Sequence, residues 1–376
     1  MKIAVLKERR PDEARVAATP DTVKKFKGLG VDITVEAGAG AQSYFSDDEY
    51  SAAGATIAAD AAKALDGADV VLKVLRPLDD ELKAMKQGTM LAAMLAPYAD
   101  REAVKAYAGK GVNAFAMEFM PRITRAQSMD VLSSQSNLAG YKAVIDAAAA
   151  FGRAFPMMMT AAGTIAPARV FVMGVGVAGL QAIATAKRLG AIVSATDVRA
   201  ATKEQVQSLG GTFVMVEDEE SKAAETAAGY AKEMSDGYKK KQAALISETI
   251  KKQNIVITTA LIPGRPAPVL VSEEMVRSMK PGSIIIDLAT EQGGNCPLSK
   301  AGQTIEVGGV KIIGTVNLAG RLAADASSLY ARNLFNFLAP LIDKTSKALK
   351  IDWNDEIIKG TCLTHDGQVV HPALKG

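Results

Sequence analysis

The sequence predicts an α/β protein with mostly parallel sheets. Short strand-like apolar runs alternate with helical stretches along the chain, which is the pattern of repeated strand and helix units. The chain has 376 residues, enough for roughly two to three domains that each bury a core. Because hydrophobic residues make up 48% and charged residues 23%, the composition argues against long disordered segments.

The first α/β unit begins with a strand at residues 3–6. Thr19 is predicted to cap the following helix, and Pro20 occupies its first turn, where the missing N–H costs nothing. That helix ends at Gly28 or Gly30. Further strands are expected at residues 32–36, 69–74, 89–94 and 113–118, with helices around residues 58–65 and 101–109.

A long helix at about residues 132–151 leads into a second unit, because its apolar residues recur at spacings of three and four. The expected strands of this unit lie at residues 170–173, 191–195, 212–216, 255–259, 283–288 and 311–314. Another long helix is expected at residues 329–348, before a tail that contains glycine and proline.

Two segments depart from this alternation. Residues 155–168 carry no charge up to Ala168 and predict a hairpin with Ala162 and Gly163 at its tip. Its methionines at residues 157–159 are interpreted as core filler rather than a binding motif, although exchange between protomers would bury them equally well. Residues 217–241 favour, by composition, solvated surface helices, and a mobile lid is the alternative.

The strongest motif is a glycine pattern between a predicted strand and a predicted helix. Its residues are Gly174, Val175, Gly176, Val177, Ala178 and Gly179. Gly174 permits a tight turn, Gly176 lets the backbone approach a pyrophosphate, and Gly179 lets the helix pack closely on the strand. The helix N-terminus offers free N–H groups to the anion, so the motif predicts dinucleotide binding.

An acidic residue follows at the position expected for recognition of the adenine ribose. Asp197 lies 21 residues after Gly176, at the end of the next predicted strand. Its carboxylate would accept hydrogen bonds from both ribose hydroxyls and repel a 2′-phosphate, which favours NAD(H) over NADP(H). Arg199 is the kind of neighbour that holds a 2′-phosphate, but we weight the carboxylate more heavily.

Composition excludes several classes of protein. The net charge of +3 does not indicate nucleic-acid binding, and no apolar segment is long enough to insert into a membrane. Cys296 and Cys362 cannot form a disulfide framework or a zinc site, which indicates a reducing compartment. Met1 leads directly into a strand, so we expect no secretory leader and a cytoplasmic location. The only histidines, His365 and His371, are expected to be solvated tail residues rather than general bases.

Residues 120–141 are dense in hydrogen-bonding side chains where the two units meet in sequence. They form either an ordinary connection, with Asp130 capping the long helix, or a set of ligand contacts at the mouth of a cleft. Ligand contact is at least as well supported as the plain connection.

Several segments together identify a family. They are residues 122–141, the run GVGVAGLQAIATAKRLGA at residues 174–191, and residues 195–203, 229–234, 258–264 and 293–297. Over essentially its whole length the chain resembles the NAD(H)-binding component, domain I, of proton-translocating nicotinamide nucleotide transhydrogenase. Its fold class would then be α/β with two Rossmann-like domains, whose parallel sheets flank a cleft and of which the second binds NAD. By analogy with two-domain dehydrogenases, we expect residues 1–131, completed by residues 325–376, as the first domain and residues 132–324 as the second.

The resemblance implies a set of site residues. Arg122, Gln127, Asp130 and Ser133 would line the nicotinamide end, as catalytic residues, with Gln127 close to the transferred hydride. Gly229 and Tyr230 would belong to a loop that closes over the nucleotide, which reverses the preference drawn from composition. The implied contacts to NAD(H) are Arg122, Ile123, Thr124, Gln127, Asp130, Ser133, Gly174, Val175, Gly176, Val177, Ala178, Gly179, Asp197, Val198, Arg199, Gly229, Tyr230 and Leu261.

The resemblance also implies partners. In the family, hydride passes directly from NADH to NADP⁺ held on a separate NADP(H)-binding domain, and a membrane-spanning subunit couples the transfer to proton translocation. We therefore expect a homodimer that lies peripherally at the inner face of the bacterial cell membrane through these partners.

Two other functions compete with this one. Alanine dehydrogenase has a similar fold, and Arg15 and Lys73 match its substrate-binding positions, but Met94 stands where its catalytic histidine would be. Without that imidazole the amino-acid reaction loses its proton carrier. A non-catalytic NAD-binding module would not need the polar residues at 122–133. One departure from the transhydrogenase pattern is Asn317, in a loop where many members place a proline.

Overall fold

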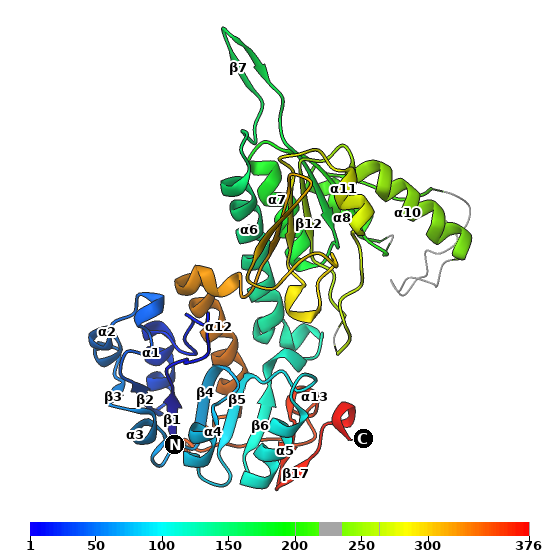
Figure 1. Ribbon diagram of the computed structural model, residues 1–376. Coiled ribbons are helices and arrows are strands. Elements are labelled where there is room, and N and C mark those ends of the chain that lie inside the picture. Colours follow the sequence, from blue (N-terminus) through cyan, green and yellow to red (C-terminus); the bar gives the residue numbers. More distant parts are fainter. Residues whose placement is uncertain (200, 218–234, 263, 376) are drawn as a thin grey trace. The chain divides into compact units, whose positions relative to one another are not determined.

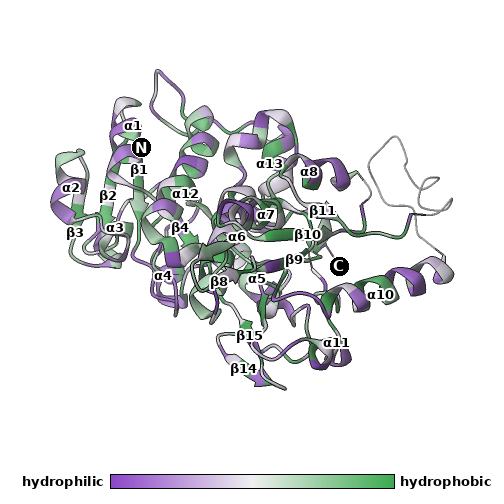
Figure 2. Ribbon diagram, turned by 90° about the horizontal axis from the view of Figure 1, so that it is seen from above, coloured by the Kyte–Doolittle hydropathy of each residue, from purple (hydrophilic) through white to green (hydrophobic). Residues whose placement is uncertain are grey.

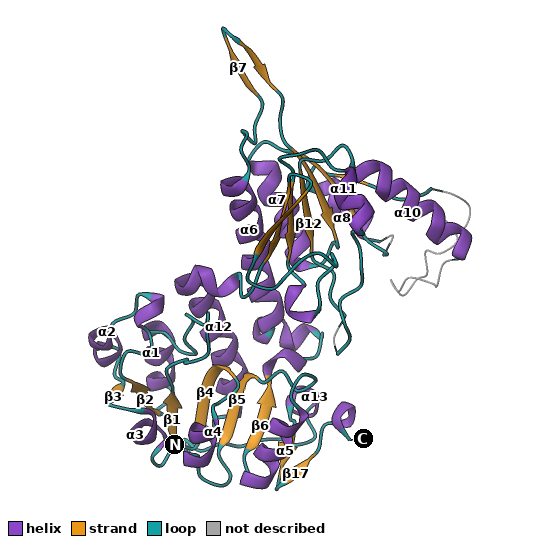
Figure 3. Ribbon diagram, in the orientation of Figure 1, coloured by secondary structure: helices purple, strands orange, loops and turns teal. Residues whose placement is uncertain are grey.

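The computed structural model describes residues 1–199, 201–217, 235–262 and 264–375. The chain divides into two compact units, Met1–Gln135 with Ala319–Gly376, and Ser136–Leu318. Each unit is built on one main sheet with helices on both of its faces (Figures 1 and 3). The predicted α/β class is therefore confirmed for both units.

The sheet of unit 1 has six strands, all parallel, in the order β3-β2-β1-β4-β5-β6. The strands are β1 (Lys2–Val5), β2 (Asp32–Glu36), β3 (Thr56–Ala58), β4 (Val70–Leu75), β5 (Met90–Met94) and β6 (Asn113–Ala116). The strand order reverses between β1 and β4, which is the place where open α/β sheets bind ligands.

Helices cover both faces of this sheet. They are α1 (Pro20–Gly28), α2 (Asp47–Ala52), α3 (Ala61–Leu65), α4 (Asp79–Ala84), α5 (Arg101–Lys110), α12 (Ala323–Leu338) and α13 (Glu356–Thr361). One buried core joins Ile3 and Val5 to α1 and α12, and a second joins Ala4 and Leu6 to α3 and α5. The alternation of side chains along β1 thus feeds two cores. Thr19 caps α1 with its side chain and Pro20 stands in the first turn, as predicted.

The sheet of unit 2 has seven strands in the order β11-β10-β9-β12-β13-β15-β14, and only β14 runs antiparallel to its neighbour. The strands are β9 (Arg169–Met173), β10 (Ile192–Thr196), β11 (Thr212–Phe213), β12 (Ile255–Thr258), β13 (Ile284–Asp287), β14 (Thr304–Val307) and β15 (Val310–Gly314). The buried β9 and β10 read green in the hydropathy view, whereas α10 carries both colours (Figure 2). The order again reverses, between β9 and β12.

The helices of unit 2 also form two layers. They are α6 (Val131–Ala150), which begins within unit 1, α7 (Val177–Arg188), α8 (Thr202–Ser208), α10 (Asp236–Ile250) and α11 (Glu273–Ser278). One core packs α6 and α7 against the sheet, and the other packs α10 and α11. Short 3-10 turns complete the chain at Ala41–Ser43, Met117–Phe119, Thr124–Met129, Thr290–Gln292, Ala319–Leu322, Ala339–Leu341 and Pro372–Leu374.

A hairpin of β7 (Met158–Thr160) and β8 (Gly163–Ile165) stands away from the sheet of unit 2 (Figure 1). The hairpin itself is confirmed, but its tip was placed one residue too late, because Thr160 pairs with Gly163 and leaves Ala161 and Ala162 in the turn. The interpretation of its methionines as core filler is wrong within this chain, since Met159 is 78% exposed.

Other differences from the predicted elements have local causes. The last long helix runs over Ala323–Leu338 rather than to residue 348, because Pro340 supplies no N–H to continue the helical bonding. The tail after it is structured, and its residues Thr364–His365 (β16) and Gln368–Val369 (β17) form a small antiparallel pair. β3 and β14 were missed because each is short and half exposed, so neither has a continuous apolar run.

Candidate nucleotide-binding site

The glycine pattern forms the turn between β9 and α7, as predicted. Gly174 has φ +100°, a left-handed value that favours glycine, and a Cβ there would approach Thr259 Oγ1 at 2.6 Å. A Cβ on Gly179 would lie 1.9 Å from the carbonyl oxygen of Gly174. The first and third glycines are therefore required for the fold of the turn.

The second glycine differs, because a Cβ on Gly176 would meet nothing within 4 Å. Gly176 precedes the first turn of α7, and no side chain of the described residues caps that helix terminus. Unbonded N–H groups and the positive end of the helix dipole thus face open space, which fits a pyrophosphate. This opening is the test that a dinucleotide cofactor has to pass, and the residues present pass it.

A second close approach supports the turn from outside the motif. A Cβ on Gly140 of α6 would lie 2.1 Å from the carbonyl oxygen of Ala178. Gly140 therefore lets α6 pack directly against the start of α7. Sequence analysis gave this glycine no role, because a lone glycine inside a helical pattern has no local signature.

Asp197 and Arg199 lie beside the turn, after β10. The carboxylate of Asp197 accepts the N–H of Val175 at 2.7 Å, and it pairs with the guanidinium of Arg199 through two contacts of 2.9 Å. Burial acts to raise the pKa of Asp197, yet the guanidinium of Arg199 and the N–H groups of Val175 and Arg199 together lower it below its ordinary value. Asp197 is therefore an ionised acceptor next to the helix terminus.

The loop after β12 carries Leu261, whose side chain is 47% exposed. The buried Asn295 fixes this loop, because its Nδ2 donates to the carbonyls of Ala260 and Pro268 and its Oδ1 accepts the N–H of Ala260. Val177 and Val198 are exposed as well. Asn295 belongs to one of the segments that identified the family, but sequence analysis assigned it no function, because its bonds join residues about thirty positions apart.

The predicted nicotinamide residues lie in unit 1, on the 3-10 turn Thr124–Met129 and the start of α6. Asp130 accepts the N–H of Ser133 at 2.9 Å and its hydroxyl at 2.5 Å, so Asp130 caps α6. Arg122, Thr124 and Gln127 are exposed, and Ile123 is half-buried. Among the described residues, the side chains of Arg122 and Gln127 make no hydrogen bond or ion pair.

The neighbouring Arg125 has a different task, because its guanidinium makes a bidentate pair with Asp355 of the C-terminal segment. Asn333 and Asn336 of α12 both donate to the carbonyl of Ser128. These bonds fix the 3-10 turn to the body of unit 1, and they could not be foreseen from residues so far apart in sequence.

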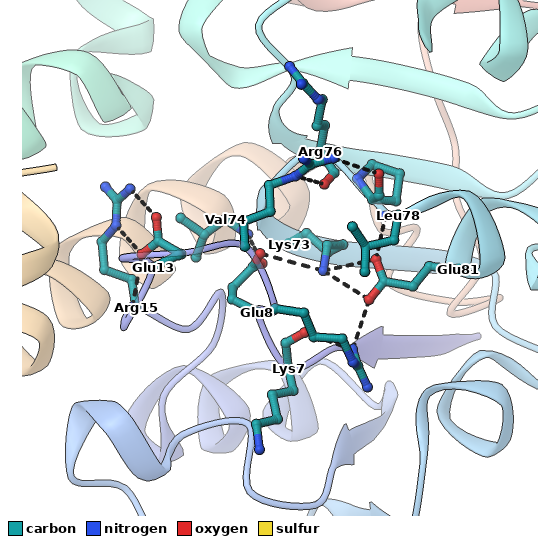
Figure 4. Close-up of polar contacts among 12 residues, drawn as sticks. Lys7, Glu8, Glu13, Arg15, Lys73, Val74, Arg76, Leu78 and Glu81 are labelled. Atoms are coloured by element: carbon teal, nitrogen blue, oxygen red, sulfur yellow. Dashed lines mark hydrogen bonds and ion pairs between the residues drawn. The ribbon is translucent and has the colours of Figure 1, made fainter. Parts of the chain in front are cut away.

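Arg15 and Lys73 lie in a buried cluster of charges in unit 1 (Figure 4). Arg15 is paired with Glu13 and donates to Gln135 at 2.8 Å. Lys73 lies between Glu8, at 3.5 Å, and Glu81, at 3.2 Å. Carboxylates of the same chain thus neutralise both cations that an amino-acid substrate would need.

Glu8 is the carboxylate of this cluster with the least support. Its Oε1 accepts the N–H of Val74, whereas its buried Oε2 has no hydrogen bond. Burial raises the pKa of Glu8 to about 7, although Lys73 opposes the shift. Close to neutral pH the cluster therefore takes up a proton.

Neither histidine fits the expectation of a solvated tail residue. His365 stacks on Trp353 with 3.5 Å between ring centroids, and His371 bonds the carbonyl of Gly360 at 3.2 Å. Burial lowers the pKa of His371 below its ordinary value. Both rings are packed in unit 1 and hold the C-terminal segment, so they are structural rather than catalytic.

Gly229 and Tyr230, and the lid inferred from them, lie outside the described residues. Within the described part of the chain, no group of three or more histidine, cysteine, aspartate or glutamate side chains could hold a metal ion. No helix among the described residues combines the length and apolar character needed to cross a bilayer.

Comparison with known proteins gives consistent matches over the whole chain. The family model for the alanine dehydrogenase/PNT N-terminal domain matches residues 4–139, and the model for the C-terminal domain matches residues 143–372. The chain is 61% identical, over 381 aligned residues, to an NAD(P) transhydrogenase subunit alpha of Rhodospirillum rubrum, covering 100% of this chain and 99% of that protein. The structure of transhydrogenase from Sinorhizobium meliloti has a TM-score of 0.90 at 56% identity, covering 98% of this chain and 100% of that one. The structure of L-alanine dehydrogenase has a TM-score of 0.83 at 25% identity, covering 100% and 98%.

Proposed function

The chain belongs to the alanine dehydrogenase/PNT family, among the NAD(P) transhydrogenase alpha subunits, and from this premise we propose that it binds NAD(H) and exchanges a hydride directly with NADP(H) held by a partner subunit. The observation that carries the proposal is the open helix terminus at Gly176 with the ionised Asp197 beside it. Partner subunits are implied because the relatives are named as alpha subunits.

The residues of this chain bind and orient rather than move protons. The bound dinucleotide supplies the hydride. The N–H groups of α7 hold its pyrophosphate, and Asp197 accepts bonds from the adenine ribose, which disfavours a 2′-phosphate. Gln127 and Arg122, with unpaired polar groups among the described residues, orient the nicotinamide end. Transfer between two nicotinamide rings releases no proton at the reacting carbons, so no general base is needed.

The alternative, alanine dehydrogenase activity, is less well supported. Met94 stands where that reaction would need a proton carrier, and the carboxylates around Arg15 and Lys73 leave neither cation free for a substrate carboxylate. The moderate identity to L-alanine dehydrogenase fits a shared fold with separate chemistry.

The function is tested by mixing the chain with NADH deuterated at C4 and an NADP⁺-loaded NADP(H)-binding domain of a transhydrogenase. We expect deuterium in the NADPH produced, measured by mass spectrometry, with no loss of label to water. NADPH offered to this chain in place of NADH is expected to react far more slowly. Loss of the label to solvent, or reduction of pyruvate with ammonia by the chain alone, would contradict the proposal.

We propose that a second copy of the chain covers the exposed β7–β8 hairpin and that the protein is a homodimer. The hairpin carries Met157, Met158, Met159 and Ile165, all exposed apolar side chains, which is costly in water. The change Met159→Glu is expected to convert the dimer to a 39.4 kDa monomer in sedimentation velocity. Val269→Glu, at another exposed apolar site of unit 2, serves as the control. A wild-type monomer, or a dimer that Met159→Glu leaves intact, would refute this interface.

A further inference from the structure

The carboxylate of Asp197 already has a full set of hydrogen bonds within its own chain. Oδ1 accepts the backbone N–H of Arg199 at 2.9 Å and Nε of the same residue at 2.9 Å. Oδ2 accepts the N–H of Val175 at 2.7 Å and Nη2 of Arg199 at 2.9 Å. Each carboxylate oxygen offers about two acceptor positions, so none is left for a ligand.

Two of these four bonds come from the backbone and two from one movable side chain. The side chain of Asp197 is only 7% exposed, whereas that of Arg199 is 44% exposed. Nη2 of Arg199 also donates to the carbonyl of Val175 at 3.2 Å. The guanidinium therefore closes Asp197 and the glycine turn from the solvent side.

We propose that Arg199 competes with the cofactor for Asp197, because its guanidinium fills the two acceptor positions that the hydroxyls of the adenine ribose require. NADH binds fully only after the guanidinium has left. This inference rests on the proposed function, since it concerns how that same site admits NAD(H).

The geometry makes the exchange one for one. Nε holds one oxygen of Asp197 and Nη2 holds the other, just as the two hydroxyls of a ribose would. The backbone bonds from Val175 and Arg199 can persist in both states. The ligand replaces two charge-assisted bonds by two neutral ones, so the ion pair lowers the affinity for NADH.

The test is the affinity of Arg199→Met for NADH, measured by calorimetry at pH 8. Methionine keeps the length of the side chain and removes its donors. We expect NADH and ADP-ribose to bind about threefold to tenfold more tightly, in keeping with the modest strength of a partly exposed ion pair. Reduced nicotinamide mononucleotide, which has no adenine ribose, should bind unchanged.

Arg277→Met is the matched control, because Arg277 also pairs with a carboxylate of unit 2, that of Glu273, on the surface of α11. It should leave all three affinities unchanged. Arg199→Lys keeps the charge without the planar fork and is expected to bind NADH with an affinity between those of the wild type and Arg199→Met.

Weaker binding of NADH by Arg199→Met would show that the guanidinium contacts the bound cofactor, and this result would overturn the inference. Equal affinities of the wild type and Arg199→Met would overturn the inference while leaving the proposed function standing. Failure of both proteins to bind NADH at all would overturn the proposed function, and the inference with it.

Discussion

Replacing Gln127 by asparagine is expected to slow hydride transfer to the partner subunit about a hundredfold while changing the affinity for NADH by less than about tenfold. The 3-10 turn that carries Gln127 is held by Asn333 and Asn336 through the carbonyl of Ser128, so the backbone cannot follow a shorter side chain. Loss of one methylene withdraws the amide by about 1.5 Å. Misplacement on that scale is costly for a transfer that depends on orientation, whereas the contacts at Gly176 and Asp197 are untouched.

The measurement is a single-turnover assay of deuteride transfer, together with calorimetry of NADH binding, so that chemistry and binding are separated. Gln42→Asn is the control, because Gln42 is an exposed glutamine on another 3-10 turn of unit 1. A Gln127→Asn protein that transfers at the wild-type rate would remove Gln127 from the proposed site.

Replacing Lys73 by methionine is expected to destabilise unit 1 by about 3–5 kcal/mol at pH 8. The ammonium group is the shared partner of Glu8 and Glu81, and all three side chains are buried. Its removal leaves the carboxylate of Glu8 without the cation that it contacts. Thermal unfolding at pH 8 should show a midpoint lower by on the order of 10 °C.

Glu8→Gln provides the contrast, because it imitates the protonated acid. The pKa of Glu8 is about 7 in the folded chain and 4.5 as a free group, so folding favours the proton. The stability that this group contributes is therefore fully present below pH 4.5 and is lost as the pH rises through 7. At pH 8 Glu8→Gln should be more stable than the wild type, by an amount on the order of 3 kcal/mol. A Lys73→Met midpoint equal to that of the wild type, or a stability of Glu8→Gln that falls between pH 5 and 8 as steeply as in the wild type, would contradict this account.

Much of the fold can be predicted because local patterns determine it. A buried parallel strand such as β12 or β13 is a continuous apolar run, and its length is legible in the sequence. The glycine turn is legible too, since its three glycines meet separate steric demands within six residues. Strand order is not legible, because an apolar run specifies a buried strand and not the neighbour with which it pairs.

The candidate site divides in the same way. Asp197 could be placed by its spacing from Gly176, but the pairing that engages it with Arg199 depends on side-chain geometry. Asn295 and Asn333 act through bonds to distant backbone carbonyls, for which a single sequence has no signal. The exposure of Met159 could not be predicted either, because composition cannot tell a methionine in a core from one that awaits a second chain.

The discontinuity of unit 1 has a consequence for synthesis on the ribosome. Unit 2 is one unbroken stretch, whereas unit 1 needs the residues that follow Leu318. The hydroxyl of Ser327 accepts the N–H of Val16, and that of Tyr330 donates to the carbonyl of Lys73, so α12 fastens strands made hundreds of residues earlier. Until α12 emerges, one face of the first sheet lacks its cover and remains open to aggregation. The segment of the chain that is made first is therefore finished last, and translation gives the middle of the chain the earliest opportunity to fold.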